Sequence, residues 1–229
     1  MKKTQSEINL KEITFYNPIQ SAVDIFPPTP AKKTVPSWYK DISDQSDFAP
    51  SIKNCHPVQD IITSGYILKS SIEYDVSIST NETNTEIFET QCPMGIQADI
   101  HTHEQFPIVK EGVKKTFLKL NTGWSIKTPK GYSCLLMQPF YFLEDRFTVL
   151  PAIVDTDMYD GSISFPLLIN KKNVIIEPGT PLVQVIPFKR DDWESKVQQK
   201  NSSSILELFI PRPFAGIYRK FCKSKKKFN

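Results

Sequence analysis

The chain has 229 residues, 39% of them hydrophobic and 11% aromatic, which is enough to bury the core of one large domain or two small ones. No stretch reaches the roughly 18 to 20 unbroken apolar residues of a membrane helix, and the N-terminus lacks the apolar segment of a signal peptide. These features argue against a membrane protein, and we expect an intracellular one.

The formal net charge of +3 belongs to the end of the chain. The last eleven residues hold six cations and no acid: Arg219, Lys220, Lys223, Lys225, Lys226 and Lys227. Without these six cations the net charge of the chain is −3, so a cationic groove is not indicated. Aromatic residues interleave with the cations, which suits contact with a nucleotide or an acidic partner; a solvated tail is the alternative.

Proline dominates the first part of the chain from residue 17 to residue 57. Because proline lacks a backbone donor and restricts the residue before it, we expect residues 1–57 to form an extended arm with little sheet. Phe26, Val35, Trp38 and Tyr39 are its expected anchors on the domain.

A β domain is predicted over residues 58–190. A short helix at 60–64 ends before Gly65, a good C-terminal cap. Alternating apolar residues predict strands at 66–69, 72–79 and 86–91, and a polar loop covers 97–105. Further strands are expected at 116–120, 124–127, 133–138, 147–154, 161–169, 174–176 and 182–188, with turns between them at 121–123 and elsewhere. Many short strands indicate a sandwich or barrel.

Residues 191–229 are predicted to form a helical segment followed by the basic tail. Trp193 and Val197 stand four apart, which favours a helix over 191–199, and residues 202–209 could extend it. The four cysteines, Cys55, Cys92, Cys134 and Cys222, are far apart and form no CxxC pair. They predict free thiols rather than a zinc site or disulfides.

Three segments of the strand array resemble motifs of the dUTPase and dCTP-deaminase superfamily. Residues 152–163 are AIVDTDMYDGSI, similar to its apolar–Asp–x–x–Tyr–x–Gly segment, and residues 176–186 are IEPGTPLVQVI, similar to its Gly-x-x-apolar-Ala-Gln strand. Residues 128–132, TPKGY, resemble the Pro-Pro-Gly-Tyr turn that precedes these two segments in the family. The resemblance covers about a third of the chain and implies a mainly β fold: a dUTPase-like β-clip or distorted barrel, commonly homotrimeric.

The resemblance also implies candidate site residues. Asp155, or Asp157 beside it, would orient water, and Tyr159 would pack on a sugar. Gln184 would line the same pocket. Gln138 stands at the position of the family's phosphate-gripping motif and is a further candidate for ligand binding. Asp155 and Tyr159 are four apart instead of three, so either Thr156 takes the base position or a bulge intervenes.

Other features of the family are missing. Residues 138–142, QPFYF, replace its Arg-Ser-Gly motif, the glycine-rich lid is absent, and residues 162–167 lack the deaminase glutamate. We therefore do not expect an ordinary dUTPase or deaminase. Residues 53–57, 64–67 and 179–193 also resemble an uncharacterised family of phages and bacteria, which places the protein in the cytoplasm of a host cell or in a virion.

His101 and His103 form a second candidate site. With Asp99 or Glu104 they could bind a divalent metal, although a polar loop is the plainer interpretation. No cofactor is otherwise indicated.

Three functions stay open on the sequence. The first is binding or assembly on a dUTPase-like β scaffold, most simply as a homotrimer. The second is a hydrolase of nucleotides or other small molecules in which Asp155 or Asp157 orients water. The third is a structural component of a virion.

Overall fold

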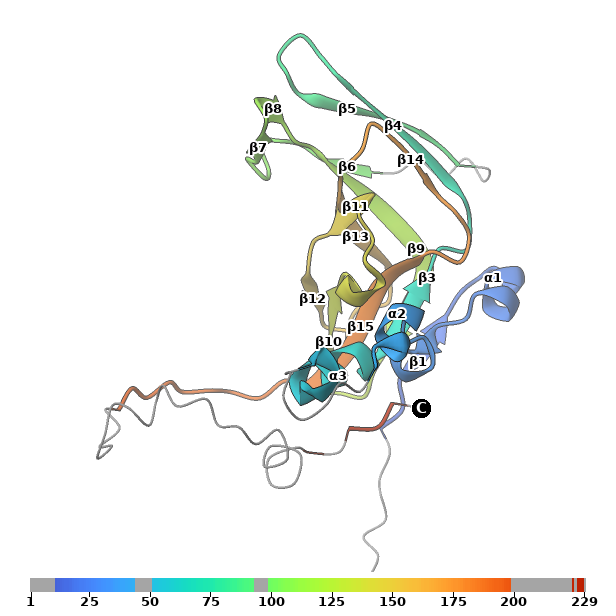
Figure 1. The fold of residues 1–229 in the computed structure, drawn as a ribbon, viewed down its shortest axis with the longest axis vertical. Helices are drawn as coiled ribbons and strands as arrows, with labels where there is room; N and C mark the ends of the chain where they lie inside the picture. Colours follow the sequence, from blue (N-terminus) through green and yellow to red (C-terminus); the bar gives the residue numbers. More distant parts are fainter. Residues whose placement is uncertain (1–10, 44–50, 93–98, 199–223, 225, 229) are drawn as a thin grey trace, which may run out of the picture.

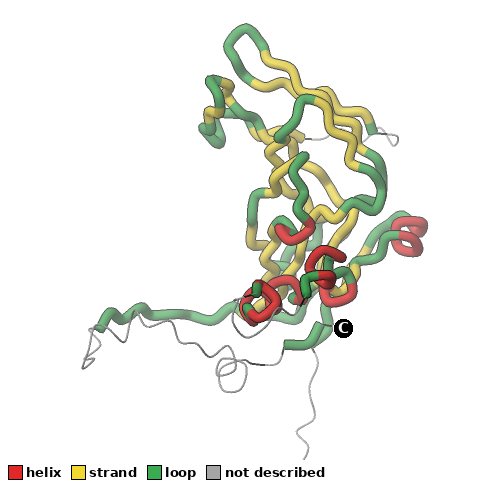
Figure 2. The backbone as a smooth tube through the Cα atoms, viewed as in Figure 1, coloured by secondary structure: helices red, strands yellow, loops and turns green. Residues whose placement is uncertain are grey.

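The computed structural model describes residues 11–43, 51–92, 99–198, 224 and 226–228, and every structural statement concerns these residues. Strands dominate the described chain (Figure 2). The helices are short: α1 (Gln20–Ile25), α2 (Ser37–Asp41) and α3 (His56–Thr63), with 3-10 turns η1 (Ala31–Lys33), η2 (Ile52–Asn54) and η3 (Phe140–Phe142). None of the described helices is long and apolar enough to cross a membrane.

The strands form four antiparallel sheets (Figure 1). The first sheet runs β1 (Thr14–Tyr16), β9 (Phe117–Lys127), β13 (Ser162–Ile169), β11 (Phe147–Val149), with β6 (Asp99–His101) also on β9. The second runs β12 (Ala152–Val154), β10 (Tyr132–Met137), β15 (Pro181–Lys189), β3 (Tyr66–Lys69), β2 (Thr29–Pro30). The third runs β14 (Asn173–Ile176), β4 (Tyr74–Thr80), β5 (Glu86–Gln91), and β7 (Val109–Lys110) pairs with β8 (Val113–Lys114).

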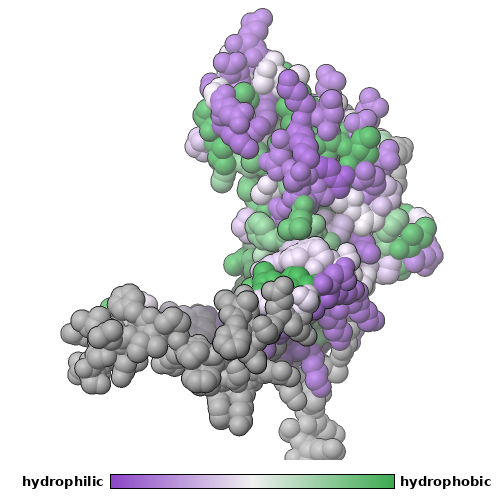
Figure 3. Space-filling model, viewed as in Figure 1, coloured by the Kyte–Doolittle hydropathy of each residue, from purple (hydrophilic) through white to green (hydrophobic). Residues whose placement is uncertain are grey.

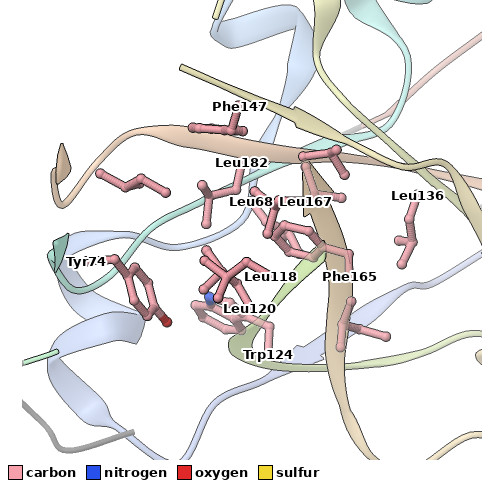
Figure 4. Close-up of a cluster of buried hydrophobic side chains, with 14 of the residues drawn as sticks. Leu68, Tyr74, Leu118, Leu120, Trp124, Leu136, Phe147, Phe165, Leu167 and Leu182 are labelled. Atoms are coloured by element: carbon pink, nitrogen blue, oxygen red, sulfur yellow. The ribbon is translucent and has the colours of Figure 1, made fainter. Parts of the chain in front are cut away.

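The core lies between the first two sheets and continues under the third. In β13 every second residue is buried, the period expected when one face of a strand packs on the core. Trp124, Phe165 and Leu136 lie in this core, together with Tyr74 from the third sheet (Figure 4). The mainly β prediction is therefore confirmed, but the sheets of the described chain are open and do not close into a barrel.

The predicted helix before Gly65 is confirmed as α3, although it begins four residues earlier. Gly65 has φ +69°, and a Cβ at this position would lie 2.0 Å from the carbonyl oxygen of Val185. Only glycine therefore lets the chain leave the helix and enter β3 against β15. The strands expected at 66–69, 72–79 and 86–91 are also present, as β3, β4 and β5.

Two predicted boundaries in the strand array are wrong. The expected turn at 121–123 is a bulge inside the single strand β9, where Gly123 has φ +72° and the register with β13 shifts. The expected strand 147–154 is broken before Pro151, which has no N–H for a ladder. Its two halves, β11 and β12, belong to different sheets.

The proline-rich arm differs from the extended form expected. It contains α1 and α2, and its strands β1 and β2 add an edge to the first and second sheets. Trp38 donates its indole N–H to the Tyr141 carbonyl at 2.7 Å, and Tyr39 is buried, so both act as anchors. The polar loop expected at 97–105 also contains a strand, β6.

The helix predicted over 191–199 is not formed in its described part, residues 191–198. Trp193 is 90% exposed and Val197 is 97% exposed, so the two apolar side chains do not pack on any described part of the chain, and packing is what stabilises most short helices. The segment instead leaves the end of β15 and runs away from the body (Figure 1). Residues 202–209, where the helix was expected to extend, lie outside the described chain.

Candidate functional site

The two candidate catalytic aspartates lie in a tight turn between β12 and β13. The amides of Met158 and Tyr159 donate to the Asp155 carbonyl at 3.0 and 2.8 Å, which closes the turn. Thr156 is fully buried at its centre, with its hydroxyl 2.7 Å from that of Thr128. In the register that puts Thr156 at the base position, the motif therefore supplies a buried hydroxyl and no carboxylate.

Arg190, at the end of β15, holds Asp157. Its Nη1 and Nη2 donate to the two carboxylate oxygens at 2.8 and 2.5 Å, a bidentate pair. The Gly131 amide donates to the same carboxylate at 2.8 Å, and the Asp157 side chain is only 5% exposed. The Arg190 hydrogen bonds, followed by that from Gly131, lower the pKa of Asp157 from its ordinary value to about 2.

Arg190 also holds Asp155. Arg190 Nη1 lies 3.1 Å from Asp155 Oδ1, and the Ser133 hydroxyl donates to that oxygen at 2.6 Å. The same guanidinium donates to the Ser133 hydroxyl at 2.9 Å. We call Asp155, Asp157, Arg190 and Ser133 the Arg190 cluster. It brings both predicted catalytic residues together, but around a protein cation instead of a ligand.

Tyr159 lies outside the Arg190 cluster. Its hydroxyl donates to the Ser162 carbonyl at 3.3 Å, and its ring lies over Gly161, where a Cβ would come within 2.4 Å of the hydroxyl oxygen. The side chain borders a cavity of about 330 Å³ that Tyr16 and Asp160 also line. Asp160 is paired there with Lys127, so all three acids of the turn already have a cationic partner.

Gln184 and Gln138 are both buried and both bind the backbone. The Gln184 amide nitrogen donates to the carbonyls of Ile61 and Ser64, each at 2.7 Å, and thereby ties the end of α3 to β15. The Gln138 side-chain oxygen accepts from the Val149 amide at 2.9 Å, and its nitrogen faces the Phe147 carbonyl at 3.4 Å. These contacts support the fold.

The two histidines proposed for a metal have no third ligand beside them among the residues that the structure describes. His101 Nδ1 lies 2.8 Å from the side-chain oxygen of Gln105. His103 Nδ1 is buried without a hydrogen-bond partner. Within the described residues, no group of three or more His, Cys, Asp or Glu side chains is placed to hold a metal ion. The metal site expected from the sequence therefore stays a prediction.

Sequence reasoning missed two arginines, Arg190 and Arg146, whose side chains tie distant segments together. Arg190 lies 33 residues from Asp157, and only its place at a strand end hinted at a role. Arg146 is bidentate to Glu144 at 2.8 Å and reaches Glu177 at 2.6 Å, tying the start of β11 to the turn after β14.

The described end of the basic tail lies against the body. Lys226 pairs with Asp60 of α3, and the Phe228 ring meets Tyr66 edge to face at 6.3 Å. These residues therefore contact the chain's own surface, and the contacts used by the rest of the tail lie outside the described residues.

Comparison with known proteins gives structural matches only. No family model matches the chain, and no curated protein matches it. The solved structures that resemble it include dUTPases. The dUTPase of EIAV has 9% identity and a TM-score of 0.38, over 83% of this chain and 99% of that one. A mutant dUTPase of Staphylococcus bacteriophage 80alpha has 14% identity and a TM-score of 0.33, over 62% and 80%. At such identities the likeness does not extend to activity.

Proposed function

We propose that this protein is a binding and assembly protein on a β scaffold and does not hydrolyse nucleoside triphosphates. The Arg190 cluster is the observation that supports this proposal. A general base needs a lone pair directed at its substrate and a pKa near the working pH. Asp157 has a pKa of about 2, is nearly buried and has both oxygens bound to Arg190, so it meets neither requirement.

The segment 191–198 supports assembly. Trp193 and Val197 are almost fully exposed, and burying a large apolar side chain stabilises a protein by roughly 1.5 to 3 kcal/mol. A second copy of the chain can supply the missing surface. Asp191, Asp192 and Glu194 outnumber Lys196 and make the segment acidic, so a basic surface of the neighbouring copy would complement it. The motif resemblance implies a homotrimer, and in a closed trimer the segment of every copy would be buried in the same way.

Light scattering on the full chain tests the assembly. The wild type should be a trimer, and the double variant Trp193→Ser/Val197→Ser should be a monomer with an unchanged circular dichroism spectrum. The matched control Ile25→Ser/Met158→Ser removes two other exposed apolar side chains, 65% and 75% exposed, and should stay trimeric. A monomeric wild type, or equal dissociation of both double variants, contradicts the proposal.

A second candidate function, a small-molecule hydrolase, is favoured only by the 57% exposure of the Asp155 side chain. The wild type and Asp155→Asn should be incubated with Mg²⁺ and each deoxynucleoside triphosphate, and the products measured by chromatography. We expect no product from either protein. Turnover by the wild type that Asp155→Asn abolishes would establish the hydrolase and refute the non-catalytic proposal.

A further inference from the structure

A cavity of about 560 Å³ lies at the end of the molecule opposite the Arg190 cluster, between the third sheet and the β7–β8 hairpin. Its walls come from four separate parts of the chain: residues 78–80 of β4, Glu86 at the start of β5, the hairpin with Lys115, and residues 169–172 between β13 and β14. Figure 3 shows that hydrophilic residues predominate on this end of the visible face. The volume falls within the range of about 300 to 1,000 Å³ that small-molecule sites occupy.

The cavity is positively charged. Its lining includes Lys110, Lys115, Lys171 and Lys172 against Glu86 and Glu111, a net charge of +2. Glu86 is 5% exposed and is paired with Lys115, so this ion pair stabilises the wall of the cavity and neutralises the charge of Lys115. Lys171 reaches out to Asp145 at 2.8 Å. Lys110 and Lys172, in contrast, make no ion pair with any described residue and remain available.

Backbone hydrogen bonds hold the walls of the cavity in place. The Ile78 amide donates to the Lys172 carbonyl at 2.7 Å, which joins β4 to the 169–172 turn. The Asn170 amide donates to the Arg146 carbonyl at 2.9 Å, and the Lys114 amide donates to the Asn84 carbonyl at 2.7 Å. The two available lysines therefore extend from backbone positions that are already fixed, and a ligand would not have to order them from a mobile loop.

The lining also provides contacts for an uncharged part of a ligand. Ile78, Val113 and Ile169 give apolar surface, while Ser79 and Thr80 offer hydroxyls. This combination suits a molecule with one strongly charged group and a larger, mostly neutral body. A cavity that only attracted inorganic ions would not need the apolar wall.

We propose that this cavity binds a small organic phosphate ester, with the phosphate between Lys110 and Lys172. A phosphate monoester carries about −1.5 to −2 charges at pH 7, which matches the two positive charges of Lys110 and Lys172. Lysine binds phosphate as a point charge, so the fork geometry of arginine is not required. The site is separate from the Arg190 cluster and does not depend on the proposed assembly.

Isothermal titration calorimetry on the full chain tests the proposal. The probes are inorganic phosphate, a nucleoside monophosphate, a hexose phosphate, and the nucleoside and hexose without phosphate. At least one of the two esters should bind more tightly than inorganic phosphate, and both unphosphorylated compounds should give no heat. Which ester binds identifies the neutral body that the apolar wall accepts.

Variants locate the binding. Lys110→Gln/Lys172→Gln should weaken ester binding at least about tenfold, because one charge-assisted hydrogen bond corresponds to about one factor of ten. Lys33→Gln/Lys130→Gln removes the same charge from exposed positions outside the cavity and should bind as the wild type does. Absence of binding at millimolar ester, an inorganic phosphate affinity equal to that of both esters, or equal weakening by both double variants would overturn the proposal.

Discussion

Replacing Gln184 by leucine should destabilise the protein whether or not any ligand exists. The substitution keeps the side chain's approximate volume but removes the amide that donates to the carbonyls of Ile61 and Ser64. Gln184 is 3% exposed, so water cannot easily replace its amide. An unsatisfied buried carbonyl costs about 1 to 3 kcal/mol, and the Ile61 carbonyl is partly buried, so we expect a loss of about 2 to 4 kcal/mol.

Urea unfolding and thermal melting measure this loss. For a chain of this size about 1 kcal/mol shifts the melting temperature by roughly 2 to 4 °C, so Gln184→Leu should melt about 5 to 15 °C lower. Gln184→Glu should be worse at pH 7, because an ionised carboxylate only accepts hydrogen bonds and would face two carbonyls. It should recover partly towards pH 5 as the carboxyl group is protonated.

The exposed Gln91 on β5 gives the matched control, since Gln91→Leu should change the stability by no more than about 0.5 kcal/mol. If Gln184→Leu is as stable as this control, Gln184 does not support α3. The ligand-binding role that the sequence predicted for Gln184 would then be the better explanation of this residue.

Three further predictions follow from other residues. The pKa of Asp157 is about 2 in the folded protein, below its value in the unfolded chain, so the ionised carboxylate stabilises the fold above about pH 5. This contribution is lost as the pH falls through 2. In urea titrations Asp157→Asn should therefore lose less stability than the wild type between pH 5 and pH 2. Gly65→Ala should prevent soluble expression because its Cβ would overlap β15. Gly131 has φ +85° but open space around it, so Gly131→Ala should lower the free energy of unfolding in urea by only about 1 to 2 kcal/mol. Equal effects of the two variants would contradict the role given to packing at Gly65. Burial raises the pKa of the Cys134 thiol to about 11, so mass spectrometry after iodoacetamide treatment at pH 8 should find exposed Cys55 modified and Cys134 unmodified until urea is added.

Local patterns in the sequence predicted the elements whose causes are local. Alternation of apolar residues located β4, turn residues on either side located β13, and the glycine after α3 marked the end of that helix. Pro151 was misjudged because its effect depends on where the chain goes next: the break sends β11 and β12 to different sheets. The helix at 191–199 was predicted from a pair spaced four apart, but such a pair stabilises a helix only against a packing surface.

The candidate site was harder to predict because its chemistry depends on distant partners. The motif around Asp155 resembles a catalytic one, yet the charge that determines the behaviour of both aspartates comes from Arg190, on another strand. The family motif likewise suggested Gln184 as a ligand contact, since nothing in its local sequence shows the end of α3 approaching.

The position of Arg190 connects the cluster with assembly. Its amide donates to the Gly131 carbonyl at 2.9 Å, so its backbone is the last to be fixed against the second sheet before the exposed segment 191–198 begins. Its side chain meanwhile holds the turn that contains Asp155 and Asp157. The amide bond and the two aspartates therefore hold Arg190 at both its backbone and its side chain, and the segment that we propose to dock on a second copy begins at this fixed residue. Under the proposed assembly, Asp155 and Asp157, which the motif resemblance made catalytic candidates, would instead position the segment that contacts a second copy.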